Sequence, residues 1–191
     1  MRRMLALSVG AVAALMFVCG TARAEKKENP MYTMWAKFKP GSSATISAVS
    51  DMAGQTTKSE TKTTLKSVSD DKVVLEMATS MDMGGNKMEM PPQSMDIPKM
   101  VDVPADAKPT PTDPGKDAKT DAKTAEESVT VKAGTFKAKM TETKMDQGGS
   151  KMTSKAWTSD EVPGGVVKME VVGEGEMKMT VKSELSAMEK K

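Results

Sequence analysis

Apolar residues recur at every second position over much of this sequence, and this spacing restricts the fold more than any other feature. Val167, Met169 and Val171 alternate with other residues in this way. A period of two places alternate side chains on opposite faces of a β-strand. Clusters of Gly, Asp and Asn, such as residues 69–72 and 84–87, interrupt the alternating segments as turns do. The pattern predicts a mainly β protein with antiparallel strands.

One short helix is expected before the strands, over about residues 30–38. Asn29 is a good helix-capping residue, and Pro30 suits the first turn. Three large side chains fall at positions i, i+4 and i+7 and so share one face of the helix: Met31, Trp35 and Phe38. We expect this face to pack against the sheet.

Residues 1–24 have the features of a secretory signal peptide. Two arginines precede an apolar run over residues 5–18, and Ala-Arg-Ala at 22–24 is a cleavage motif. The run is shorter than the roughly 20 residues of a transmembrane helix. Lipidation at Cys19 is an alternative, although the residues before it are not the small ones expected there. We expect export to the periplasm or secretion after cleavage near Ala24, with no transmembrane span in the mature chain.

Cleavage would remove side chains on which many active sites depend. All three arginines and the one cysteine lie in the predicted signal peptide, and the sequence has no histidine. Ser-His-Asp and Cys-His nucleophilic sites are therefore excluded, as are zinc sites with His or Cys ligands. The remaining lysines and acidic residues nearly balance, which argues against nucleic-acid binding. We expect a protein that is not an enzyme and has no cofactor.

A change of composition divides the strand-rich regions. Residues 103–127 are rich in Pro, Asp, Ala and Lys and contain almost no large apolar side chain. Such a segment cannot offset the entropy of ordering its backbone. We predict a long disordered insertion here, between two halves of a single β domain at residues 25–102 and 128–191.

Two stretches resemble a group of uncharacterised exported bacterial domains. Residues 129–139 read VTVKAGTFKAK, with an A-G-T-F motif, and residues 154–170 read SKAWTSDEVPGGVVKME, with a W-x-S-x-x-V-P-G-G-x-V-K motif. This group is distantly similar to the periplasmic lipoprotein-carrier (LolA-like) half-barrel fold. The resemblance implies a curved antiparallel sheet, or incomplete β-barrel, whose groove holds a lipid or small apolar molecule, and it supplies no catalytic residues. The groove candidates are Trp35, Phe38, Phe136, Trp157, Pro163, Gly164 and Gly165.

Two interpretations of Trp157 and the corner at 162–165 stay open. In the structural one, the glycines supply positive φ angles and Pro163 presets the turn, while Trp157 packs against the corner or the helix. In the functional one, Trp157 and the corner form a lip at the mouth of the cavity.

Methionine is abundant, with 20 in the sequence, and suggests another function. A four-residue loop at 84–87 would place Met83 opposite Met88 and Met81 opposite Met90, with all four thioethers on one face. Thioethers bind Cu(I) and Ag(I), but methionine also fills cores and lines grooves. The alternatives to a lipid-binding protein are therefore a Cu(I)/Ag(I)-binding envelope protein and a structural or protein-interaction module that adds a partner to an open sheet edge.

Overall fold

A computed structural model describes residues 24–52, 54–104, 119–147, 150–175 and 178–191. Within them, the fold is almost entirely β, as predicted, with a single short helix. The predicted signal peptide lies outside the described residues, apart from Ala24. The elements are β1 (Ala24–Glu28), α1 (Pro30–Ala36), β2 (Ser43–Met52), β3 (Gln55–Val68), β4 (Lys72–Met83), β5 (Asn86–Glu89), β6 (Gln93–Pro98), β7 (Met100–Pro104), β8 (Lys119–Val131), β9 (Gly134–Gln147), β10 (Ser150–Thr158), β11 (Val166–Glu174) and β12 (Met179–Glu189).

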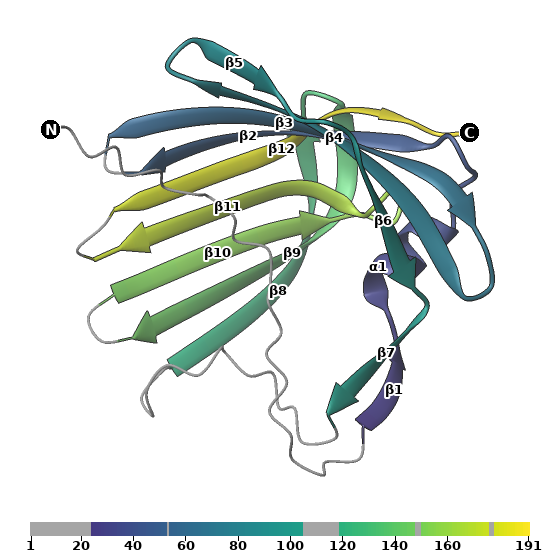
Figure 1. The fold of residues 1–191 in the computed structure, drawn as a ribbon. Helices are drawn as coiled ribbons and strands as arrows, with labels where there is room; N and C mark the ends of the chain where they lie inside the picture. The colour runs from purple at the N-terminus through teal and green to yellow at the C-terminus, as the bar shows by residue number, and fades with distance from the viewer. Residues whose placement is uncertain (1–23, 53, 105–118, 148–149, 176–177) are drawn as a thin grey trace, which may run out of the picture.

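Ten strands form one curved antiparallel sheet that does not close into a barrel. The strand order is β5-β4-β3-β2-β12-β11-β10-β9-β8, and β6 also pairs with β4. Figure 1 shows this layer, with α1 and the separate β1–β7 pair at one end. The last strand, β12, pairs with β2 near the start of the chain, so both predicted halves contribute to the same sheet. The curved, incomplete antiparallel sheet predicted from the sequence is confirmed.

The prediction that residues 103–127 are disordered is wrong for part of this segment. Of residues 103–127, the structure places 103–104 in β7 and 119–127 in β8, while 105–118 lie outside the described residues. Strand β8 is at the edge of the sheet, where backbone pairing with β9 supplies the hydrogen bonds without a large apolar content. Opposite charges also face each other across this pair, as Lys123 does with Glu142.

The helix forms where the sequence predicts it, but it ends at Ala36, and Tyr32 rather than Met31 joins Trp35 on its buried face. The Asn29 side chain accepts a hydrogen bond from the Met31 amide at 3.0 Å and so caps the first turn. Tyr32 and Trp35 are buried, whereas Met31 is 49% exposed. The Tyr32 hydroxyl donates to the Ser69 carbonyl at 2.8 Å, which ties the helix to the turn between β3 and β4.

The packed core lies at the helix end of the sheet. The completely buried aliphatic side chains there are Leu65, Val73, Val167 and Leu185. The turn between β8 and β9 reaches across to β12, where the Ala133 amide donates to the Leu185 carbonyl at 3.2 Å. A salt bridge between Lys37 and Asp160 joins the end of the helix to the corner between β10 and β11. This end of the curved sheet is therefore filled by side chains.

Candidate functional site

The pairing registers define one face of the sheet, which we call the inner face. Residues directly opposite each other on neighbouring strands point to the same side, and side chains two positions apart along a strand do so as well. One transverse row shows the principle: Met81 on β4 pairs with Ser59 on β3, which pairs with Ala48 on β2. The inner face beyond the core consists of Gln93, Met95, Met77, Thr79, Met81, Met83, Asn86, Met88, Gln55, Thr57, Ser59, Thr61, Thr63, Ile46, Ala48, Ser50, Met52, Met179, Val181, Ser183, Met169, Val171, Gly173, Met152, Ser154, Ala156, Thr141, Thr143, Met145, Ala122 and Thr124, and on β9 it ends before Lys139.

This face continues into the packed core, since Leu65 on β3 and Leu185 on β12 stand at the same alternate positions of their strands as its members. Along β3 the inner-face residues Thr57, Ser59 and Thr61 are half-buried, whereas the intervening Lys58 and Glu60 are exposed. Among the described residues, the main contacts of α1 with the sheet are with β4 and β6, at one end of this face.

No lysine, aspartate or glutamate lies in the described part of the inner face defined above. The charged residues of these strands alternate with its members and point outward, as Lys182 and Glu184 do on β12 and Lys168 and Glu170 on β11. This separation is marked because 28% of the whole sequence is charged. The charge-free area ends on β9 at Lys139, two residues before Thr141. The inner face is therefore suited to an uncharged surface or ligand.

Hydroxyl and apolar side chains share the inner face. On its β3–β4 side, the hydroxyls of Thr61 and Thr79 hydrogen-bond to each other at 3.1 Å. Nearer the centre, Val181 on β12 lies directly opposite Val171 on β11. An uncharged molecule on this surface would meet both apolar contacts and hydrogen-bonding groups.

The methionine hairpin has a different register from the predicted one. Its loop contains two residues, Gly84 and Gly85, with φ angles of +62° and +90°. A two-residue loop with positive φ at both positions matches the twist of a β-hairpin, and glycine adopts it without steric cost. Met81 consequently lies opposite Met88 rather than Met90, and Met83 lies opposite Asn86.

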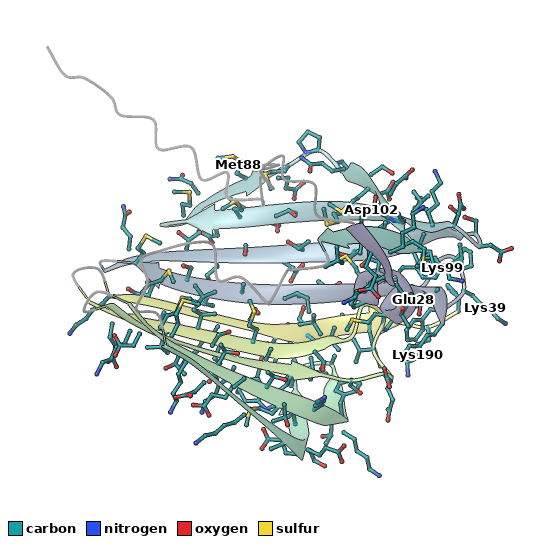
Figure 2. The ribbon with its side chains drawn as sticks, turned by 90° about the horizontal axis from the view of Figure 1, so that it is seen from below. Glu28, Lys39, Met88, Lys99, Asp102 and Lys190 are labelled. Atoms are coloured by element: carbon teal, nitrogen blue, oxygen red, sulfur yellow. The ribbon has the colours of Figure 1, made fainter. Side chains whose placement is uncertain are left out.

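The hairpin thioethers are nevertheless on one face. The observed register differs from the predicted one by two residues, and a shift of two leaves each side chain on the same side of a strand. They are also open to solvent: Met88 is 61% and Met83 53% exposed, and Met90 follows the end of β5. Figure 2 shows Met88 well away from the labelled charged residues around α1, which are Glu28, Lys39, Lys99 and Lys190.

The aromatic groove candidates lie in or against the packed core. Trp35, Phe136 and Trp157 are each less than 10% exposed, Pro163 and Gly165 are also buried, and Phe38 packs against the core. The Trp35 ring covers Gly164 so closely that a Cβ atom there would lie 2.8 Å from Cζ2 of the ring. The corner thus packs against the helix through Trp35, whereas the structural interpretation of the sequence assigned such a contact to Trp157.

Trp157 has polar partners of its own. Its indole N–H donates to the Glu127 carboxylate on β8, and the Lys168 ammonium lies 4.9 Å from the ring centroid. These contacts connect β8, β10 and β11 at the edge of the core. Sequence reasoning selected aromatic residues and missed the Ser, Thr, Val and Ala residues of the inner face, although the alternation of charges along Lys58, Glu60 and Lys62 was a visible signal for that face.

Groups with shifted pKa values lie in turns or on the outer face. A hydrogen bond from a serine lowers the pKa of Asp71. The Asp96 carboxylate, 2.6 Å from the Lys72 ammonium, raises the pKa of that lysine. Hydrogen bonds from lysines lower the pKa of Glu142 and of Glu189. These titrations change charge outside the inner face.

Comparisons with known proteins add a fold likeness only. No family model and no curated protein matches the sequence. A crystal structure of a candidate exported protein with a YmcC-like fold from Bacteroides fragilis matches with a TM-score of 0.46 and 14% identity, over 80% of this chain and 99% of that one. A candidate lipoprotein from Parabacteroides distasonis matches with a TM-score of 0.44 and 12% identity, over 80% and 98% of the two chains. Among the described residues, no helix has the length and apolar character needed to cross a membrane. The motif resemblance and the lipoprotein-carrier relationship stay predictions.

Proposed function

We propose that this protein is a non-enzymatic exported binding protein, whose inner face holds the uncharged part of a lipid or a similar small apolar molecule. The observation that carries the proposal is the separation of charge. The strands with Lys58, Glu60, Lys182 and Glu184 on their outer face have no charged residue on the described inner face. Packing among the described residues does not account for this separation, because there helix α1 covers one end of the face.

The chemistry of the inner face fits an acyl chain with a polar linkage. Burying a methylene group on an apolar surface contributes about 0.8 kcal/mol. Methionines such as Met81 and Met169 have flexible, polarizable side chains that adapt to ligands of different shape. The hydroxyls of Ser59 and Ser154 are placed among them to bind ester or hydroxyl oxygens. A negatively charged headgroup would lie at the rim of this face or in solvent, since the described inner face has no cation before Lys139 at its edge.

Native mass spectrometry of the protein as purified from an exporting bacterium tests the proposal. We expect a mass above that of the denatured chain by one lipid-sized molecule. Two variants of β3 then locate the ligand: Ser59→Asp puts a carboxylate on the inner face, and Lys62→Asp puts one on the outer face. A buried, unpaired charge costs several kcal/mol, so we expect Ser59→Asp to lower occupancy by at least about tenfold.

The outer-face variant is the matched control and should keep the ligand. Far-UV circular dichroism of both variants checks that the sheet is intact. If Ser59→Asp keeps its ligand as well as Lys62→Asp does, the inner face is not the binding surface. If the unmodified protein has no additional mass, the protein-interaction module becomes the better assignment, since β8 offers a 13-residue edge strand for pairing.

A further inference from the structure

Four methionines from four strands lie in one row across the inner face. Met52 on β2 pairs with Met179 on β12, and Met152 on β10 pairs with Met145 on β9. Gly173 on β11 lies between the two pairs, opposite both Met179 and Met152. We call Met52, Met179, Met152 and Met145 the methionine row. It crosses the sheet at the end remote from the packed core.

Gly173 leaves a gap in which thioethers from both sides can meet. A Cβ atom at this glycine would lie 3.6 Å from the Met179 Cβ and 4.0 Å from its Cε, so the Met179 side chain extends over the glycine. Neighbouring strands are about 4.8 Å apart, so Met179 and Met152 are separated by about two strand spacings without a side chain between them. Unbranched methionine side chains can span such a distance by rotating three bonds.

We propose that the methionine row binds a soft monovalent metal ion, Cu(I) or Ag(I). Thioether sulfur is a soft ligand that selects such ions, whereas Mg²⁺, Ca²⁺ and Mn²⁺ prefer carboxylate, carbonyl and water oxygens. Within the described inner face the row has no carboxylate neighbour, which disfavours the hard ions. Met52 is 48% and Met152 38% exposed, so an ion can reach the row from solvent. The row lies on the same inner face as the proposed lipid site, but metal binding there does not depend on the lipid function and uses other residues than the hairpin Met81, Met83, Met88 and Met90.

The methionine row is a better metal site than the methionine hairpin because strand pairing places more of its thioethers directly opposite each other. In the hairpin only Met81 and Met88 are directly opposed, and Met83 faces Asn86. In the row both pairs are directly opposed, and the glycine between them brings the pairs within reach of each other. The thioethers of Met179 and Met152, on the two sides of Gly173, can therefore contact one ion, with Met52 and Met145 directly beside them.

Methyl NMR of the full chain with ¹³C-labelled methionine methyl groups tests this assignment. A Cys19→Ser background removes the one thiol of the sequence, and Ag(I) serves as a probe that does not change oxidation state. We expect stoichiometric shifts of the methyl signals of Met52, Met179 and Met152, assigned by single Met→Leu variants. Shifts confined to Met81 and Met88, or no shifts, would overturn the proposal.

Competition with a Cu(I) chelator measures the contribution of the sulfurs. The triple variant Met52→Leu, Met152→Leu, Met179→Leu keeps the apolar volume and removes three thioethers of the row. A control triple variant replaces exposed methionines outside the row: Met31→Leu, Met95→Leu and Met100→Leu. Removing even a supporting group of a metal site weakens binding by about 10- to 100-fold, so at least about tenfold loss is expected for the row and none for the control. Equal affinities of the two folded triple variants would contradict the site.

Discussion

Because the helix contacts the corner closely, we predict that substituting Gly164 lowers the free energy of unfolding more than substituting other glycines does. Gly164 has a φ angle of +78°, and a Cβ atom there would lie 2.8 Å from Cζ2, 2.9 Å from Cε2 and 3.0 Å from Nε1 of Trp35. Gly164→Ala therefore combines a left-handed backbone, which costs about 1–2 kcal/mol, with overlap against a rigid ring, which costs about 1–3 kcal/mol. We expect the free energy of unfolding to fall by about 2–5 kcal/mol, a large part of the 5–15 kcal/mol typical of a domain.

Two other glycines separate the backbone cost from the overlap. Gly54 has a φ of +82° with no atom within 4 Å of its Cβ position, so Gly54→Ala should cost only the backbone term, about 1–2 kcal/mol. Gly165 has a φ of +77° and a Cβ position 2.8 Å from the sulfur of Met34. Because that side chain can rotate away, Gly165→Ala should lie close to the Gly54 control.

Urea unfolding followed by far-UV circular dichroism measures all three variants under the same conditions. The slope for small proteins is about 1–3 kcal/mol per molar urea, so the expected losses are well resolved as midpoint shifts. Truncating the ring with Trp35→Leu in the Gly164→Ala background should recover part of the loss, measured as a coupling in a double-mutant cycle. If Gly164→Ala is no less stable than Gly54→Ala, the close contact with Trp35 does not constrain the corner.

Three further predictions concern the core, the indole contact and acid stability. Leu65→Ala removes a completely buried side chain and should lower the free energy of unfolding by about 2–5 kcal/mol in urea titrations. Trp157→Phe removes the N–H donor to Glu127 and should cost about 1–3 kcal/mol; an equal loss in a Glu127→Ala background would show that the hydrogen bond contributes nothing. Because the folded-state pKa of Asp71 is lowered, its carboxylate adds stability above an unfolded pKa of about 4 and loses it as pH falls through the folded value. Asp71→Asn should therefore flatten the acid side of the plot of melting temperature against pH, and an unchanged acid side would contradict the assignment.

The sequence predicts the strands well because their signal is local. Alternation such as Val167-Met169-Val171 depends only on the period of a strand, and the Asn29–Pro30 start of the helix depends on capping within one turn. The curved open sheet came from the family resemblance and agrees with the structure. The order of the strands in the sheet cannot be predicted from such local signals, because the pairing of β2 with β12 joins residues more than a hundred positions apart.

The errors occur where backbone interactions outweigh side-chain composition. Residues 119–127 have a composition typical of disorder, yet they form an edge strand because β9 supplies a complete set of pairing partners. The methionine hairpin was predicted with a four-residue loop, but two glycines with positive φ make a two-residue loop. The methionine row depends on the pairing of four strands, so its members are scattered in the sequence from residue 52 to residue 179.

The mixed composition of the inner face explains how it can remain open. Large contiguous apolar patches on exposed surfaces promote association with other molecules. Here the serines and threonines of β3 separate the methionines of β4 from the apolar residues of β12, and hydroxyls such as those of Thr61 and Thr79 are bonded to each other. Replacing the threonines of β3 by valine would join the methionines of β4 and the apolar residues of β12 into one apolar surface without adding charge. For the proposed binding function, these hydroxyls divide the apolar area of the inner face without adding charge to it.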